Sequence, residues 1–207
     1  MASTLRIRVR TIPLKLRPND IEALKNPDSY DWILFASKNA VHYFAQELHT
    51  RRIKLPHRTR IAAVGPSTAR ELKKLKLFVD FVPKKSTAKD MLNGLGMVRG
   101  EKLLFPRSAL AKDDIARRAR ALGSSIRIVP LYTNVPIALS PSQKIKLLSG
   151  SYSHFHFSSP SGIAGLMSQL NKVERMSVRK IPAHCIGPTT ARAAKVAGFT
   201  KISIEGV

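Results

Sequence analysis

A seven-residue motif occurs twice in this chain, and its repetition limits what the chain can fold into. The sequence is VGPSTAR from Val64 and IGPTTAR from Ile186, which are 186 − 64 = 122 residues apart. The same offset relates FASKNAV from Phe35 to FSSPSGI from Phe157, since 157 − 35 = 122. Two matches in one register indicate an internal duplication of roughly domain size. The chain is therefore predicted to form two similar lobes.

Each copy of these motifs lies between an apolar run and a helical pattern. Short apolar runs bounded by turn-forming residues are typical of buried strands. Four such runs precede the motifs: Trp32–Ala36, Ile61–Val64, His154–Phe157 and Ala183–Ile186. Strands that alternate with helices predict βαβ units and a parallel sheet. Pro66 and Pro188 fall near the first helical turn, where proline removes no hydrogen bond, and Gly198 is placed like a glycine that ends a helix.

Two extended segments are expected to connect the lobes. Between the motif copies, the apolar KLLFP and the helical DDIARRARAL, which Gly123 ends, precede the extended run Ile126–Val135. Shifted by 122 residues, this run falls on Thr4–Pro13, which is also extended and basic. We therefore predict an α/β fold of two parallel-sheet lobes joined by a two-stranded β-ladder. The expected parts are a linker strand at 1–15, a central lobe at 16–125, a second linker strand at 126–139 and a second, incomplete lobe at 140–207.

The charge of the chain is unusual. Its 36 Lys and Arg residues against 13 Asp and Glu give a net charge of +23, which suggests a polyanionic partner, most often nucleic acid. The cations are scattered, however, and no zinc spacing, helix-turn-helix pattern or RNP-like aromatic motif accompanies them. Charge alone therefore predicts an anionic partner but does not identify it.

Cysteine and hydropathy indicate the compartment. Cys185 is the one cysteine, which excludes a disulfide framework and fits a reducing compartment; we expect it to be a small core residue. Neither a secretory signal nor an apolar run long enough for a membrane helix is found. We expect a soluble, cytoplasmic protein without a membrane partner.

Hydroxyl side chains follow the predicted strands. Ser37, Thr68, Ser159 and Thr190 come just after strands, at the carboxyl edge of a parallel sheet, where open α/β folds bind ligands. Helix N-termini there attract anions. Helix capping alone is an equally good explanation for any single one of them. Four matched positions in two lobes favour a cleft lined by anion-holding loops.

Other chemistry is poorly supported by the sequence. It contains no Gly-rich phosphate loop, nucleophile elbow or metal cluster. His154, His156 and His184 alternate with apolar residues, which favours packing or a surface face. Tyr132 lies in a connecting strand, where spacing alone favours packing.

The ordered set of motifs resembles a known family. FASKNAV, VGPSTAREL, LLFPRSAL, PLYTNV, FSSPSG and IGPTTARAA occur in the order and spacing of the uroporphyrinogen III synthases of tetrapyrrole biosynthesis. The likeness covers about Leu5 to Ile204. It implies two flavodoxin-like lobes and a cofactor-independent enzyme, without metal, that cyclises hydroxymethylbilane to uroporphyrinogen III with inversion of ring D and loss of water.

The resemblance also implies roles for individual residues. Tyr132 would donate a proton to the departing hydroxyl. Substrate carboxylates or pyrrole N–H groups would be held by a larger set: Ser37, Ser67, Thr68, Arg107, Ser159, Ser161, Lys180, Thr189 and Thr190. A monomer that receives its substrate from the preceding pathway enzyme is expected, with no nucleic acid bound.

The sequence departs from the family at both ends. The family's extra N-terminal strand and helix and its final helix are not found here, so the second lobe is expected to be incomplete. Two alternatives stay open: a basic nucleic-acid-binding protein and a phosphate- or sugar-phosphate-binding module.

Overall fold

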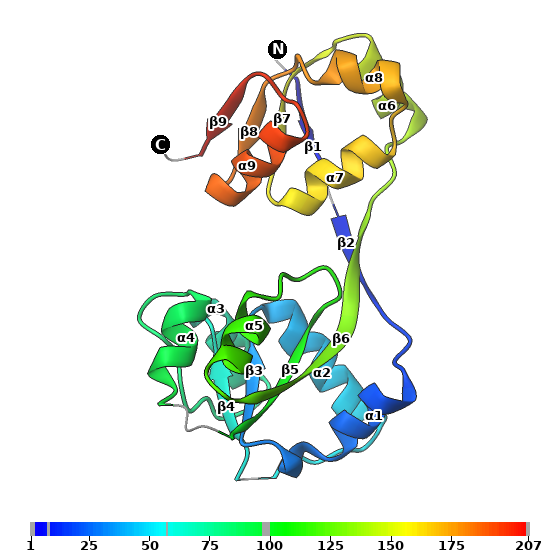
Figure 1. The fold of residues 1–207 in the computed structure, drawn as a ribbon. Helices are drawn as coiled ribbons and strands as arrows, with labels where there is room; N and C mark the ends of the chain where they lie inside the picture. Colours follow the sequence, from blue (N-terminus) through cyan, green and yellow to red (C-terminus); the bar gives the residue numbers. More distant parts are fainter. Residues whose placement is uncertain (1–2, 8, 57, 97–99, 206–207) are drawn as a thin grey trace. The chain divides into compact units, whose positions relative to one another are not determined.

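The computed structural model describes residues 3–7, 9–56, 58–96 and 100–205. The chain divides into two compact units (Figure 1). One, here called the inserted unit, is Thr11–Thr133. The other, the flanking unit, combines Met1–Arg10 with Asn134–Val207. Each is an α/β structure; the sheet of the flanking unit is parallel and that of the inserted unit is mostly parallel, as the repeat predicts.

The inserted unit is built on a sheet with the strand order β2-β6-β5-β3-β4. The strands are β2 (Val9–Pro13), β6 (Ser125–Pro136), β5 (Lys102–Ser108), β3 (Trp32–Phe35) and β4 (Arg60–Ala63). The pairs β3–β4, β3–β5 and β5–β6 are parallel. All of β3 is buried, because apolar clusters cover both faces of a parallel sheet of this type: Ile33 and Phe35 belong to one cluster and Trp32 and Leu34 to another.

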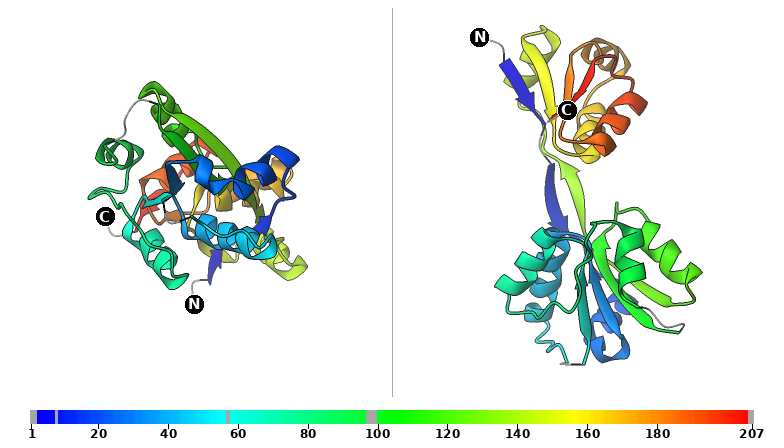
Figure 2. Two further views of the ribbon diagram at one scale, coloured as in Figure 1. Left: turned by 90° about the horizontal axis from the view of Figure 1, so that it is seen from below. Right: turned by 90° about the vertical axis from the view of Figure 1, so that its left-hand side faces the viewer.

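Helices lie on both sides of this sheet (Figure 2). They are α1 (Pro18–Lys25), α2 (Lys38–Thr50), α3 (Pro66–Lys74), α4 (Ala88–Gly94) and α5 (Asp114–Ala121), with a 3₁₀ turn, η1, at Pro27–Ser29. The sequence patterns did not predict α1. Its Asp20 is 1% exposed and pairs with Arg17 and with Arg127 of β6, both at 2.8 Å. The contact with Arg127 ties the helix to the strand.

The flanking unit has a four-stranded sheet in the order β1-β7-β8-β9. The strands are β1 (Ser3–Arg6), β7 (Tyr152–Phe157), β8 (Ala183–Cys185) and β9 (Ile202–Ile204), and all pairs are parallel. Its helices are α6 (Pro141–Leu148), α7 (Pro160–Ser168), α8 (Lys172–Val178) and α9 (Pro188–Val196). Buried residues of all four helices join one cluster with Phe155 and Phe157, so this cluster packs on one face of the sheet.

The other face of the flanking sheet carries histidines. Shifted by 122 residues, Trp32, Leu34 and Ala62 correspond to the histidines of β7 and β8. In the inserted unit these three residues are buried in the cluster that α4 and α5 cover. Here His184 is exposed, and His154 and His156 are partly exposed. The alternation of histidine and apolar residues therefore reflects a sheet buried on one face. The sequence left packing or a surface face open for these histidines, and the structure places them on the less buried face.

Several local expectations are also confirmed. Pro66 and Pro188 are the first residues of α3 and α9. Gly123 and Gly198 follow α5 and α9 with positive φ values of 83° and 90°, which glycine adopts without strain. Cys185 is fully buried, and burial raises the pKa of its thiol.

None of the helices formed by the described residues has the length and apolar character needed to cross a bilayer.

The histidine face predicts a pH-dependent stability. The ring of His154 stacks on His184 at 4.3 Å, and its nitrogens lie 2.8 Å from Thr4 Oγ1 and 3.0 Å from Ser153 Oγ. Burial, and then the neighbouring His184 and His156, lower the pKa of His154 below 6.5. His154 therefore takes up a proton more readily in the unfolded chain than in the folded one. Its contribution to the free energy of unfolding is fully present above about pH 6.5 and is lost as the pH falls through the folded-state pKa.

We expect His154→Gln to weaken the loss of stability between pH 7.5 and pH 5, measured by urea unfolding at both pH values. His49→Gln, at an exposed position of α2, is the control. An unchanged pH dependence in His154→Gln would show that this residue does not contribute.

Candidate functional site

The two serines that follow β3 and β7 cap helices. Ser37 Oγ accepts a hydrogen bond from the Ala40 N–H at 3.1 Å, at the start of α2. Ser159 Oγ accepts one from the Gly162 N–H at 3.4 Å, at the start of α7. Both serines are in extended backbone conformation, as N-caps normally are. Capping is thus part of the role of Ser37 and Ser159.

The matched threonines do not cap. The N-caps of α3 and α9 are Gly65 and Gly187, without a side-chain cap bond, and Thr68 and Thr190 are the third helical residues. Thr68 is 4% exposed and Thr190 3%. Capping therefore does not explain these two residues, and their hydroxyl groups are not committed to the start of a helix.

The glycine of the first motif lies close to the segment that precedes α4. A Cβ atom on Gly65 would lie 2.7 Å from Ser86 Oγ, so the exposed side chain of Ser86 would have to turn away. Its φ of −156° is ordinary extended backbone. The loop before Thr68 thus packs directly under the segment that leads to α4.

Tyr132 lies near the carboxyl end of the inserted sheet. In β6 it is paired in register with Ser108, the last residue of β5. Its side chain is 4% exposed, and its hydroxyl is 2.9 Å from Ser37 Oγ. The structure therefore brings together two of the predicted residues, which are 95 positions apart in the sequence.

The environment of Tyr132 keeps its phenol protonated. Burial raises the pKa of Tyr132 above 10.0; the hydrogen bond with Ser37 acts against this, and the nearby Tyr43 adds to it. A phenol of this kind holds its proton at neutral pH and is able to donate it.

Two further residues at this position were missed by the sequence analysis. The ring of Tyr43, from α2, stacks on that of Tyr132 with centroids 4.9 Å apart and planes 17° apart. Its hydroxyl donates to Thr11 Oγ1 at 2.9 Å. Ser108 Oγ accepts from the Leu110 N–H at 3.2 Å. Tyr43 occupies an ordinary apolar position of the helical pattern, which gives no sign of a role in a site. Only Ser108, two residues after the predicted strand KLLFP, had a usable signal in the sequence.

Three more predicted residues lie beside the hydroxyls described above. Ser67, Ser161 and Thr189 belong to the first turns of α3, α7 and α9. Ser161 Oγ is 2.9 Å from Ser159 Oγ. The first backbone N–H groups of a helix have no acceptor within that helix, although here the N–H groups of Thr68 and Thr190 donate to the carbonyl oxygens of the N-caps Gly65 and Gly187 at 3.1 Å. These loops can thus offer both hydroxyl and amide donors to an anion.

The two predicted cations are placed differently. Arg107 lies near the carboxyl end of β5 but is engaged internally: it pairs with Asp113 at 2.6 Å and donates to the Lys112 carbonyl oxygen at 2.9 Å. Lys180 follows α8 and precedes β8. That location is the amino edge of the flanking sheet, opposite to the loop of Thr190. The structure does not bring Lys180 to the hydroxyl-bearing edge.

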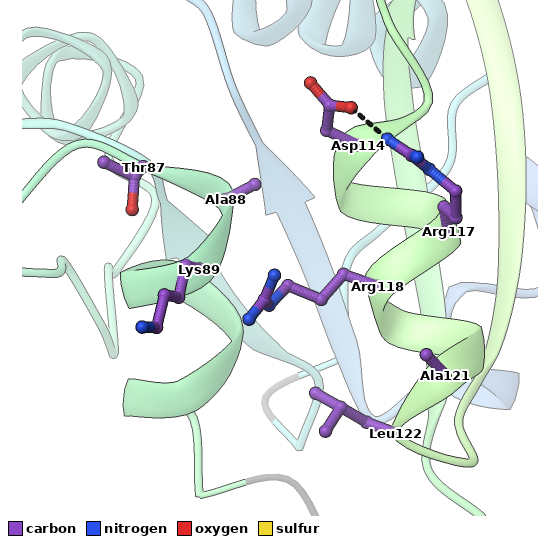
Figure 3. A pocket seen from close by; sticks show the side chains of 8 residues that line it. All are labelled: Thr87, Ala88, Lys89, Asp114, Arg117, Arg118, Ala121 and Leu122. Atoms are coloured by element: carbon purple, nitrogen blue, oxygen red, sulfur yellow. Dashed lines mark hydrogen bonds and ion pairs between the residues drawn. The ribbon is translucent and has the colours of Figure 1, made fainter.

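A separate pocket lies between α4 and α5 (Figure 3). Arg118 extends from α5 across this pocket toward α4, where Lys89 lies, and Arg117 pairs with Asp114 at 2.5 Å. None of the predicted site residues lines it. It is a cationic feature of the helix layer and not part of the sheet-edge site.

Within the described residues, no group of three or more His, Cys, Asp and Glu side chains is arranged to hold a metal ion. The chemistry that the named residues offer at the sheet edge of the inserted unit is hydrogen bonding by hydroxyl and amide groups and proton donation by a phenol.

These features define a class of protein. It is an α/β protein of two parallel-sheet units, each with hydroxyl-bearing loops after its strands, and one unit holds a buried phenol paired with a serine. Comparison with known proteins gives the family. The model of the family "Uroporphyrinogen-III synthase HemD" matches residues 9–205, and the chain belongs to the uroporphyrinogen-III synthase family.

Individual relatives agree with this assignment. The chain is 30% identical over 192 residues to the porphyrin biosynthesis protein HemD of Ruminiclostridium josui, covering 90% of this chain but only 38% of that protein. It is 27% identical over 174 residues to the uroporphyrinogen-III synthase of Chlorobaculum parvum, covering 81% of this chain and 70% of that protein.

Solved structures show the same fold. A mutant uroporphyrinogen III synthase of the extremely thermophilic bacterium Thermus thermophilus superposes with a TM-score of 0.67 at 18% identity, covering 96% of this chain and 82% of that one. The uroporphyrinogen-III synthetase of Helicobacter pylori gives 0.63 at 17% identity, with 98% and 92% covered. The expectation of two α/β lobes of this type is confirmed. These relatives give no support to the nucleic-acid-binding or sugar-phosphate-binding alternatives.

The contrast between capping and non-capping hydroxyls predicts different effects on stability. Thr68→Val removes a hydroxyl that caps no helix, so the free energy of unfolding is expected to stay within about 0.5 kcal/mol or to rise. Ser37→Ala removes a helix cap and the hydrogen-bond partner of a buried phenol. It is expected to lower the free energy of unfolding by about 1–3 kcal/mol. Chemical denaturation of both variants measures this.

Thr190→Val makes the equivalent change in the flanking unit and is expected to behave like Thr68→Val. If either valine variant were as destabilised as Ser37→Ala, that threonine would be structural and not held for a ligand.

Proposed function

We propose that this chain is a uroporphyrinogen-III synthase, which cyclises hydroxymethylbilane to uroporphyrinogen III with inversion of ring D and release of water. Family membership and the names of the relatives support the reaction. The observation that carries the proposal is the buried Tyr132 phenol, hydrogen-bonded to Ser37 at the sheet edge where loops offer hydroxyl and amide donors.

The first step is loss of the substrate's hydroxyl. Tyr132 donates its proton to the departing oxygen, the carbon–oxygen bond breaks and water leaves, giving a cationic azafulvene. Ser37 Oγ already accepts from the Ala40 N–H, and in this mechanism its own O–H donates to Tyr132 Oη. The phenolic proton is then free for the substrate, and the phenolate that forms keeps a hydrogen bond.

The later steps need positioning more than chemistry. The substituted carbon of the last ring attacks the azafulvene, and the resulting spiro intermediate fragments and closes again with that ring turned over. A ring carbon then loses a proton as aromaticity returns, and this proton restores the Tyr132 phenol. Atoms and charge balance with water as the only by-product. Closure without the enzyme gives the uninverted isomer, so the protein acts by holding one attack geometry.

Substrate carboxylates are the ligands that we assign to the loops. Ser67 and Thr68 of the inserted unit, and Ser159, Ser161, Thr189 and Thr190 of the flanking unit, would bind them through hydroxyl groups and first-turn N–H groups. Arg107 would contribute only if it left Asp113, and Lys180 is not included because it lies at the other edge of its sheet. The net charge of +23 would attract a substrate rich in carboxylates from solution.

We also propose that the protein acts as a cytoplasmic monomer that receives its unstable substrate from the preceding enzyme of the pathway. The single, buried cysteine fits a reducing compartment.

Substitution of the phenol tests the proposal. Purified protein given hydroxymethylbilane is expected to form isomer III in excess over isomer I, resolved by chromatography of the oxidised porphyrins. Tyr132→Phe keeps the ring but removes the proton donor, so kcat is expected to fall by about 100-fold with little change in the free energy of unfolding.

Tyr152→Phe, a buried tyrosine of the flanking unit, is the matched control and is expected to retain wild-type activity. Formation of isomer I alone by the wild-type protein would contradict the proposed function. Equal rates for wild type and Tyr132→Phe would contradict the role of the phenol.

A further inference from the structure

Tyr132 is held at two points, and the mechanism above uses only one of them. Its hydroxyl is 2.9 Å from Ser37 Oγ, while its ring lies against Tyr43 with centroids 4.9 Å apart. A single hydrogen bond at Oη fixes the position of the oxygen but leaves the ring free to turn about it. The stacked ring of Tyr43 fixes the plane.

Both restraints come from one helix. Ser37 is the N-cap of α2, and Tyr43 lies within the same helix. Phe44 and Val41 of α2 are fully buried, so the helix is anchored in the core and presents the two groups in a constant geometry. Tyr43 itself is only partly buried.

The ring of Tyr43 is fixed in turn by a strand. Its hydroxyl donates to Thr11 Oγ1 at 2.9 Å, and Thr11 lies in β2, the neighbour of β6 in the sheet. Tyr132 is in β6. A series of contacts therefore runs from Thr11 to Tyr43, from Tyr43 to Tyr132 and from Tyr132 to Ser37. Through two hydrogen bonds and one stacked pair of rings, it links two adjacent strands to α2.

We propose that Tyr43 is a positioning residue for Tyr132 in the cyclisation, and that Thr11 fixes Tyr43 in the orientation that the stack requires. The inference rests on the proposed function. Proton donation to a departing group depends on the direction of the O–H bond as well as its distance. Loss of the stack therefore affects the chemical step and not the binding of carboxylates, which lies with the loops.

Core packing is the alternative role for Tyr43, because its ring also contacts the apolar cluster of the inserted unit. The two roles separate in pairs of variants. Tyr43→Phe keeps the ring and removes only the bond to Thr11, while Tyr43→Leu keeps an apolar side chain and removes the stack. Tyr30→Leu is the matched control, since Tyr30 is another partly buried tyrosine against the same cluster.

Kinetics on the intact protein form the first part of the test. We expect Tyr43→Leu to lower kcat about tenfold with KM within about twofold of wild type. Tyr43→Phe is expected to recover most of the activity, and Thr11→Val to resemble Tyr43→Phe. Tyr30→Leu is expected to leave kcat unchanged. A rise in KM at constant kcat, or equal losses in Tyr43→Leu and Tyr30→Leu, would overturn the inference.

A spectroscopic measurement that needs no substrate forms the second part. With tyrosine labelled on its ring, the NMR signals of Tyr132, assigned by their absence in Tyr132→Phe, should carry a ring-current shift from the stacked Tyr43. The shift should persist in Tyr43→Phe and disappear in Tyr43→Leu. Its absence in the wild type would overturn the inference even if Tyr43→Leu were slow.

The two proposals fail in different ways. If wild-type protein gave isomer I alone, the proposed function would fail, and the NMR result would still report whether Tyr43 fixes the ring. If Tyr132→Phe were slow and Tyr43→Leu were not, the function would stand and the positioning role of Tyr43 would be wrong.

Discussion

The hydroxyl of Ser37 is the contact on which the rest of this account depends. The same oxygen begins α2, by accepting from Ala40, and meets the Tyr132 phenol at 2.9 Å. One small side chain thus joins the start of a helix, and so the end of β3, to the strand β6. Helix formation and the position of the Tyr132 phenol are not independent, because the cap fixes where Ser37 Oγ lies. The reaction inferred here asks for little more than a placed donor and a bent substrate.

Much of the fold followed from the sequence because the duplication repeats strand and loop patterns at one offset. The strands around Phe35 and Phe157, the prolines that begin α3 and α9, and the glycines that end α5 and α9 were all expected and are found. The helix α1 was not expected, because what holds it in place is the buried Asp20 and its contact with Arg127, 107 positions away. Local patterns do not contain such a contact.

The candidate site was predictable only in part. Serine and threonine after a parallel strand are at the sheet edge by topology, so the loops could be found. Whether a given hydroxyl caps a helix could not be foreseen, and the structure separates Ser37 and Ser159, which cap, from Thr68 and Thr190, which do not. The roles of Tyr132 and Lys180 came from family resemblance. A residue just before a strand, such as Lys180, lies at the amino edge of a parallel sheet, away from the loops that follow the strands. Topology alone, read from the sequence, already predicted this location.

The two copies of the duplicated fold differ in the residues that they carry. The inserted sheet is covered on both faces, whereas the matching positions of the flanking sheet carry His154, His156 and His184 in place of Trp32, Leu34 and Ala62. Only one of the units has a tyrosine paired with its capping serine among the described residues. This difference is the reason why we propose proton donation for the inserted unit and anion binding, through the loops of Ser159 and Thr190, for the flanking unit.

The most direct test of the central contact is the pKa of the Tyr132 phenol, followed by NMR of the labelled phenolic carbon in wild type and in Ser37→Ala. In the arrangement described, burial raises this pKa above 10.0 and the hydrogen bond from Ser37 lowers it again by stabilising the phenolate. Removal of the serine hydroxyl should therefore move the titration of Tyr132 to higher pH. A titration that is unchanged or moves to lower pH in Ser37→Ala would show that this hydrogen bond does not control the phenol, and the account would be wrong.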